Sequence, residues 1–599
     1  MTILARWAVM ASVVVGLSAA AQGDDWVDRA NRQAGLVPGN KAIEAELFPA
    51  LAAMDEPPVS ERGLRTLAFK RCSFLSPDDA EWDALATWAQ GDAQVKVLEA
   101  LEQVGDATKR WMFALPFGRD AVESAWAERG LCITLGAEGM LAGAEYTYFN
   151  GVAQMHLLVT VEANRLLAEG KGDEGLERYE DLLWFYRYLA DRETIVEKRT
   201  AMDLMIQLCG QMRDLAYRGQ RAKQMTGKGI AKVVASMEER ELYIMRVRPP
   251  DLTKLFVEQL IESTLGGPDG VDAFAVAMAR ATTAERPIML FNESAKWREV
   301  ASGHAGVIET LKQVDVVLGD YATRWTFEWW DPLLKLPTDF QKMDHRHYAA
   351  IVALAGDAGA LLPLRQKLVV ELAGTRCAMG GAGYTLDFEH PAREIVRLQP
   401  TYVPSLKQNL DAYKYNDWEK GLDELLYFVP GTGQRVEIAG RPGVWDIALP
   451  GEGGDEGSDG PSAMQQGMAA AREALKNMGA TEEQLAQFDE QDIEPGQVVD
   501  EIATQLDGPN GDLIREMLKG SGVLNADGSL NRDAMLAELT AGSGSASGAA
   551  GPTVEVDRNT FVLYSVGPDG VDNGARSYDD DMIFWPPLFS MQRGRGAHE

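Results

Sequence analysis

Carboxylate and amide side chains recur within one short segment near the C-terminus: Asp569, Asp572, Asn573, Asp579, Asp580 and Asp581. Carboxylates this close repel one another unless water or a cation neutralises them. Ca²⁺ accepts six to eight oxygen ligands in loose geometry, whereas Mg²⁺ demands a strict octahedron. The sequence therefore predicts a Ca²⁺ site with Asp569, Asp579, Asp580 and Asp581 as metal ligands, and a solvated hairpin tip is the alternative.

Short strands are expected on both sides of this acidic segment. Residues 561–566 (FVLYSV) have the highest β propensity of the chain, and residues 579–585 (DDDMIFW) end in a second apolar run. The turn between them begins with Gly-Pro-Asp-Gly, in which proline fixes φ and glycine allows the exit. A small β module is expected to begin within residues 401–450 and to be completed by residues 552–599.

An acidic insert, residues 451–551, separates the two parts of this β module. It opens with GEGGDEGSDG and closes with AGSGSASGAAG, and both are compositions typical of flexible linkers. The insert carries 19 acidic and 5 basic side chains. We expect a mobile acidic subdomain that contains short amphipathic helices.

Helical periodicity dominates residues 22–400. After a break at residues 170–173, apolar side chains recur at alternating spacings of three and four and so share one helix face. They are Leu176, Tyr179, Leu183, Tyr186 and Ala190. Residues 152–218 therefore predict a helical hairpin and a third helix. Further helices are expected at 230–265, 308–321, 347–361 and 364–376. The predicted fold class is mainly α, with a small C-terminal antiparallel β module, or α+β overall.

The first 21 residues have the pattern of a secretory signal peptide. Arg6 precedes an apolar stretch, and Ala19 and Ala21 form the small-x-small pattern that signal peptidase accepts. The apolar stretch is too short to span a bilayer comfortably. We expect cleavage before Gln22 and an exported protein, periplasmic or extracellular, without a transmembrane span in the mature chain.

The formal net charge of the chain is −32. A field of this sign repels nucleic acids and anionic membrane surfaces, so neither is expected as a partner. It favours solubility, cations and basic partners. Most of the charge is interpreted as an ordinary solubilising surface.

The four cysteines, Cys72, Cys132, Cys209 and Cys377, show no CxxC spacing. This excludes the usual zinc-knuckle and thioredoxin-like patterns. In an oxidising compartment the four thiols could form two disulfides with three connectivities, or they could remain as buried thiols. Both alternatives stay open at the level of the sequence.

Two other motifs receive structural interpretations. Asp344-His345-Arg346-His347 precedes a run with helical character, where the two imidazoles would point apart, so Asp344 is expected to cap a helix. Gly380-Gly381-Ala382-Gly383 lacks the GxGxxG pattern and indicates a loop or a close helix contact rather than a dinucleotide site. His156 is interpreted as a core histidine. The sequence identifies no catalytic residues.

The acidic segment resembles the C-terminal calcium loop of the type II secretion major pseudopilins. The resemblance lies in Leu563-Tyr564-Ser565-x-Gly567-x-Asp569-Gly570 and in Asp579-Asp580-Asp581-Met582-Ile583. It implies that Asp569, Asp579 and Asp581, with Asp580 as a register alternative, bind calcium together with backbone carbonyls. It also implies that the loop stabilises a small three-stranded sheet. Residues 411–415 (DAYKY) resemble, more weakly, the lead-in to that sheet.

The whole chain resembles large, exported, mostly helical bacterial proteins of unknown function that share this C-terminal segment. True pseudopilins begin with a Gly-Phe-Thr-Leu-x-Glu methylation site and a long assembly helix, and this chain begins with an ordinary signal peptide instead. The resemblance therefore implies a calcium-stabilised fold element and not assembly into a pilus.

Three functional hypotheses follow. The first is a non-catalytic exported scaffold or interaction protein with an envelope protein as partner. The second is an exported hydrolase that acts on polysaccharide or envelope material through two carboxylates in a cleft. The third is an accessory subunit of a secretion or surface-assembly apparatus, which rests on the terminal resemblance alone.

Overall fold

The computed structural model describes residues 26–59, 64, 75, 77, 81–106, 109–136, 139–244, 247–266, 270–283, 293–327, 331–356, 358–406, 410–417, 421–432, 434–438, 554–556, 558–576 and 581–587. The signal-peptide segment, most of the acidic insert's surroundings, Asp579 and Asp580 lie outside the described residues. The chain divides into two compact units, residues 1–453 with 551–599, and residues 454–550. All described residues belong to the first unit.

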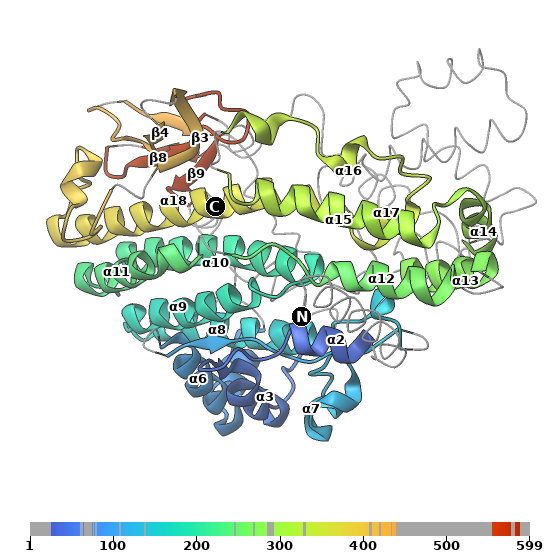
Figure 1. Ribbon diagram of the computed structural model, residues 1–599. Helices are drawn as coiled ribbons and strands as arrows, with labels where there is room; N and C mark the ends of the chain where they lie inside the picture. The colour runs from blue at the N-terminus through green and yellow to red at the C-terminus, as the bar shows by residue number, and fades with distance from the viewer. Residues whose placement is uncertain are drawn as a thin grey trace, which may run out of the picture. The chain divides into compact units, whose positions relative to one another are not determined.

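The fold is mainly α with a small antiparallel β module, as the sequence predicts (Figure 1). The α-helices in the described part are α2 (Trp26–Gln33), α3 (Ile43–Ala53), α5 (Trp82–Ala89), α6 (Asp92–Gly105), α7 (Ser124–Glu128), α8 (Phe149–Ala168), α9 (Gly172–Leu189), α10 (Ile195–Ala222), α11 (Gly227–Ile244), α12 (Thr253–Thr264), α13 (Gly270–Thr283), α14 (Glu293–Gly303), α15 (Val307–Arg324), α16 (Asp339–Lys342), α17 (Ala349–Leu354) and α18 (Leu361–Phe388). The 3₁₀ turns are η3 (Arg119–Ala121), η5 (Leu141–Gly143), η6 (Pro332–Lys335), η7 (Ala358–Ala360) and η8 (Ile395–Leu398).

The predicted hairpin and third helix are α8, α9 and α10, and α10 lies at the centre of the main core. It contacts both α9 and α18, which lie on either side of it (Figure 1). Its N-terminus is capped locally, because the Thr194 hydroxyl oxygen accepts a hydrogen bond from the backbone N–H of Glu197 (3.2 Å). The predicted apolar stripe of α9 is fully buried, so this part of the sequence prediction is confirmed.

The small antiparallel strands pair with one another and pack on α18 (Figure 1). The strands are β1 (Lys41–Ala42), β2 (Trp111–Met112), β3 (Leu410–Asp417), β4 (Gly421–Glu424), β5 (Leu426–Phe428), β6 (Val436–Ile438), β7 (Val554–Val556), β8 (Val562–Ser565) and β9 (Met582–Trp585). A three-stranded sheet has the order β5-β8-β9, and β3 pairs with β4 and β6 with β7. Strands β8 and β9 fall within the predicted runs 561–566 and 579–585.

Glycines allow the β module to approach α18 closely. A Cβ atom at Gly374 would collide with the ring of Phe584, and one at Gly381 would collide with the ring of Phe561. Phe561 also stacks on Trp585 with ring centroids 5.3 Å apart. The glycine cluster of the sequence therefore serves a close helix contact, one of its two expected roles, within a helix that continues to Phe388.

Several sequence expectations were wrong in their boundaries. Residues 230–265 form two helices, α11 and α12, because the Arg-Pro-Pro-Asp segment at 248–251 cannot continue a helix. Residues 347–361 contain only the short helix α17 and the 3₁₀ turn η7. Helices α13 and α14 and strands β3, β4 and β5 were not predicted as such.

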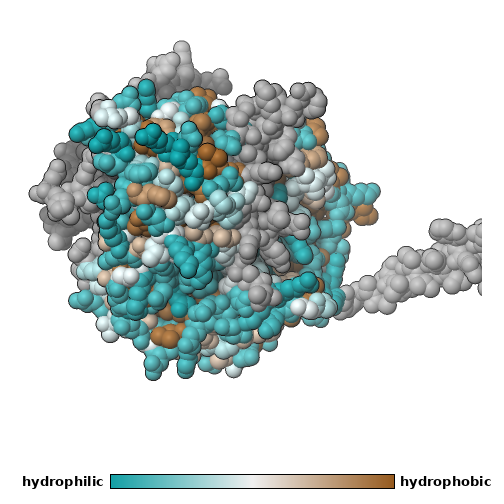
Figure 2. Space-filling view, turned by 90° about the vertical axis from the view of Figure 1, so that its left-hand side faces the viewer, coloured by the Kyte–Doolittle hydropathy of each residue, from teal (hydrophilic) through white to brown (hydrophobic). Residues whose placement is uncertain are grey.

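The surface in Figure 2 is mostly hydrophilic, and its apolar residues form separate patches. Exposed large apolar side chains in the described part include Ile308, Val396 and Phe388. None of the described helices combines the length and the apolar character that crossing a bilayer requires.

Candidate functional site

The acidic loop joins β8 to β9 at one end of the three-stranded sheet. Gly567, Gly570 and Gly574 all have positive φ, which lets the chain turn repeatedly within a few residues. The Asp569 carboxylate accepts a hydrogen bond from the Val571 N–H (3.0 Å). The loop therefore has a defined backbone, and Asp569 is exposed on it.

Asp581 is the buried carboxylate of this loop, with only 1% of its surface exposed. Its Oδ2 accepts the N–H of Ala575 (2.9 Å), and its Oδ1 accepts the N–H of Asn573 (3.5 Å). Burial raises the pKa of Asp581, and the negative charges of Asp572 and Asp569 raise it further, against those two hydrogen bonds. Loading this carboxylate with negative charge is therefore unfavourable without a nearby cation.

Asp572 is a third acidic side chain of the loop, which the sequence analysis did not choose as a ligand. Its Oδ1 accepts hydrogen bonds from the Tyr564 hydroxyl and the Gly574 N–H, both at 2.9 Å. These contacts tie the loop to strand β8 and leave the second carboxylate oxygen of Asp572 without a described hydrogen bond. Its position beside Asp581 follows from the loop's turns, and spacing in the sequence does not reveal it.

Asp411 of β3 anchors the start of the loop from a different strand. It is fully buried, and its carboxylate accepts hydrogen bonds from Ser565 Oγ (2.8 Å), Tyr413 N–H (3.0 Å) and Val566 N–H (3.1 Å). Burial raises its pKa, and these hydrogen bonds lower it. Asp411 therefore fixes the end of β8, and only the weak resemblance of residues 411–415 pointed to it.

The structure brings Asp569 and Asp581 into one loop, but it does not test the full predicted ligand set. Asp579 and Asp580 lie outside the described residues. Among the described residues, no three His, Cys, Asp or Glu side chains are grouped so that they could hold a metal ion. Asp569, Asp572 and Asp581 form no ion pair with any described basic side chain.

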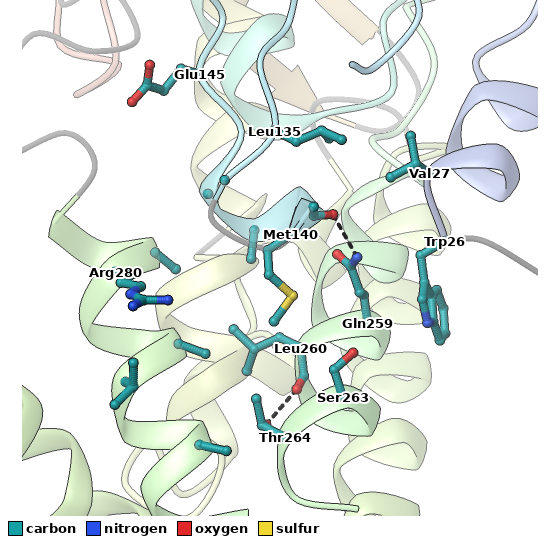
Figure 3. A pocket seen from close by; sticks show the side chains of 18 of the residues that line it. Trp26, Val27, Leu135, Met140, Glu145, Gln259, Leu260, Ser263, Thr264 and Arg280 are labelled. Carbon is teal, nitrogen blue, oxygen red and sulfur yellow. Dashed lines mark hydrogen bonds between the residues drawn. The ribbon is translucent and has the colours of Figure 1, made fainter. Parts of the chain in front are cut away.

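A second candidate site is a groove of about 950 Å³ between residues 134–145 and helices α12 and α13 (Figure 3). We call it the α12–α13 groove. It is lined by Trp26, Val27, Thr134, Leu135, Gly136, Gly139, Met140, Ala142, Gly143, Glu145, Gln259, Leu260, Ser263, Thr264, Asp272, Ala273, Val276, Ala277, Arg280 and Ala281. No motif in the sequence predicted it, because its residues come from four separate segments.

Gln259 fixes one wall of the α12–α13 groove. Its Oε1 accepts the Leu141 N–H (2.7 Å), and its Nε2 donates to the Gly139 carbonyl (3.0 Å). Both ends of the amide are therefore used to hold the 139–141 segment against α12. Gly139 has a φ of 78°, and a Cβ atom there would meet nothing within 4 Å, so open space lies in front of it.

The Asp344–His347 motif forms a turn and does not cap a helix, as had been expected. The Asp344 carboxylate accepts the N–H groups of Arg346 (3.0 Å) and His347 (3.1 Å), and α17 begins only at Ala349. His347 Nδ1 bonds the Gly303 carbonyl (2.9 Å), and its Nε2 lies 3.5 Å from Glu309. These contacts join the turn to α14 and α15.

His156 is a fully buried core residue, in agreement with its interpretation from the sequence. Its Nδ1 lies 2.7 Å from the Tyr186 hydroxyl, and its Nε2 lies 2.9 Å from Gln211 Nε2. Burial lowers the pKa of His156 to about 3, so the imidazole is neutral at physiological pH. The amide donor of Gln211 then places the acceptor nitrogen at Nε2 and the proton at Nδ1.

The three described cysteines, Cys132, Cys209 and Cys377, are buried and carry free thiols. Burial raises the pKa of the Cys209 thiol to about 12. A thiol of this kind is a poor nucleophile and packs as a small apolar side chain. Cys72 lies outside the described residues.

Comparison of the chain with protein-family models, with curated proteins and with solved structures gives no match in any of the three. The class that fold and site define is a mainly helical protein with a docked, small antiparallel β module.

Proposed function

We propose that this chain is an exported, non-catalytic scaffold or interaction protein whose C-terminal β module is stabilised by Ca²⁺. The observation that carries the calcium part is the buried Asp581 carboxylate, whose pKa is raised by burial and by the neighbouring Asp572 and Asp569. Export rests on the signal-peptide pattern of residues 1–21. The partner class is an envelope protein.

The chemistry of the loop's donors supports Ca²⁺ over a smaller cation. Carboxylate oxygens of Asp569 and Asp572 accept no second hydrogen bond from a described residue, and the glycine-rich turns expose backbone carbonyls. Ca²⁺ tolerates such a mixed and irregular oxygen shell. Asp569 and Asp581, with Asp579 and Asp580, would hold the ion. It would supply positive charge that offsets the repulsion among the carboxylates.

A thermal melt of the mature protein with calcium or with chelator tests the proposal. Ca²⁺ that binds only the folded state should raise the melting temperature, since stabilisation reaches about 2.7 kcal/mol at 100 times Kd. Calorimetric titration should show saturable heat at one site. Magnesium at the same concentration should produce a much smaller shift.

Asp569→Asn is the informative variant, because an amide oxygen can still accept the Val571 N–H and preserve the turn. The calcium-dependent rise in melting temperature should be lost, whereas stability in chelator should stay equal or increase as repulsion with Asp581 falls. Asp120→Asn, an exposed carboxylate in η3, is the matched control and should respond to calcium as the wild type does. Identical melting of the wild type with calcium and chelator would refute the proposal.

A further inference from the structure

The α12–α13 groove has the size and lining of a small-molecule site. Its volume of about 950 Å³ falls within the range of roughly 300–1,000 Å³ that is typical of ligand pockets. Met140 and Leu260 occupy its centre, and Leu260 is completely buried. Val276, on the α13 side, is an apolar side chain with 39% of its surface exposed. The centre of the groove therefore offers an apolar surface to a ligand.

Charged groups occur only on the rim among the described lining residues. Asp272 is paired with Arg298 of α14 (2.5 Å), so its charge is compensated. Arg280 is exposed on α13, and Figure 3 shows its guanidinium directed toward Met140. The same view places Trp26 on the opposite side of Met140 and Leu260. The polar and apolar ends of the groove are thus separated along its length.

This arrangement favours one charge type for the ligand. A guanidinium binds a carboxylate through two parallel hydrogen bonds, which are among the stronger contacts available to a small ligand. The net charge of −32 repels anions at long range, but salt screens that field beyond about 8 Å at physiological ionic strength. Glu145, exposed on the rim, disfavours a head group with more than one negative charge.

We propose that the α12–α13 groove binds a single-chain amphiphile with one carboxylate. The carboxylate pairs with Arg280, and the apolar chain lies over Met140 and Leu260 toward Trp26. Gln259 is a positioning residue, because it holds the wall that contains Met140 against α12. This site is separate in the fold from the acidic loop, so it stands or falls independently of calcium.

Calorimetric titration of the mature protein with three probes that share a ten-carbon chain tests the proposal. The probes are decanoate, decylammonium and decyl glucoside, used below their micelle concentrations and in chelator so that calcium does not precipitate decanoate. Decanoate should bind best. Arg280→Gln should weaken decanoate binding roughly tenfold, as loss of a charge-assisted contact does, and leave decyl glucoside binding unchanged.

Two further variants keep the test specific. Ala273 lines the groove from the exposed side of α13, so Ala273→Trp should fill the groove and abolish binding of all three probes without disturbing the core. Arg346→Gln removes an exposed arginine outside the groove that pairs with Glu299 and should change nothing. Circular dichroism confirms that each variant is folded. Absence of decanoate binding, equal affinity for decylammonium, or equal loss in Arg346→Gln would overturn the proposal.

Discussion

At the scale of single residues, the core of this protein contains ionisable side chains that the fold holds in unusual states. Lys198, near the start of α10, is completely buried and donates to the carbonyl of Ala190. Burial lowers its pKa to about 7; the nearby Asp191 opposes this shift and Arg187 adds to it. Such a residue makes the stability of the fold depend on pH near neutrality.

The pH dependence that Lys198 contributes has a defined sign. Its unfolded pKa is 10.5, so between pH 7 and that value the unfolded chain binds one proton more than the folded chain. Stability should therefore rise with pH in this window, by up to about 1.4 kcal/mol per pH unit. In Lys198→Met this contribution should vanish, and the variant should gain most relative to the wild type below about pH 7. Urea unfolding at several pH values measures both slopes.

Lys96→Met is the control, because Lys96 is exposed on α6 and its removal should leave the slope unchanged. Equal slopes in the wild type and Lys198→Met would show that Lys198 keeps its proton in the folded state throughout this window.

At the scale of elements, the contact between α18 and the β module is the feature on which the candidate calcium loop depends. Asp581 directly precedes β9, and two residues later in that strand Phe584 occupies the space left by Gly374. Trp585 follows, fully buried between Phe561 and Tyr217. The loop is therefore fixed at one end by a strand that is itself packed on the helical core.

This contact predicts opposite signs for the same substitution in two helices. Glycine to alanine normally stabilises a helix interior by up to about 1 kcal/mol. Gly319→Ala in α15, where a Cβ atom meets nothing within 4 Å, should show this gain. Gly374→Ala should instead destabilise by about 1–3 kcal/mol, since the new methyl group collides with Phe584.

Urea unfolding followed by far-ultraviolet circular dichroism compares the two glycine variants directly. A gain in stability in Gly374→Ala would mean that β9 does not pack against α18 in solution.

At the scale of the whole molecule, the chain leaves the first compact unit and returns to it at adjacent points. Strands β6 and β7 precede and follow the acidic insert, and they pair antiparallel, with Ile438 opposite Val554. The second compact unit, residues 454–550, is therefore connected through two neighbouring strand ends. Such a connection is typical of an inserted domain whose removal the host fold tolerates.

Replacement of residues 439–553 by Asn-Gly should give a folded protein. A two-residue Asn-Gly loop closes a hairpin whose last pair is directly opposed, as Ile438 and Val554 are. The melting transition of the helical body and its response to calcium should be unchanged. Replacement by a single glycine, which is too short to close the pair, is the matched control and should lower the melting temperature. An unfolded Asn-Gly variant would show that the insert is part of the core.

Much of the helical body was predictable from the sequence, because a helix face follows from local spacing. The stripe from Leu176 to Ala190 and the break after α8 were both found in this way. The limits of α11 and α12 were missed where apolar residues continue across the Arg-Pro-Pro-Asp segment. Strands β3, β4 and β5 were missed because short strands gain their stability from partners that are distant in the sequence.

The candidate sites divide along the same line. The sequence by itself determined that acidic residues gather near the C-terminus, since Asp569 and Asp581 are close along the chain. Only the tertiary structure decided that Asp581 is buried beside Asp572, that Asp411 anchors the loop from another strand, and that four distant segments enclose the α12–α13 groove. Burial and electrostatic coupling depend on distances in space, and packing of the whole chain sets those distances.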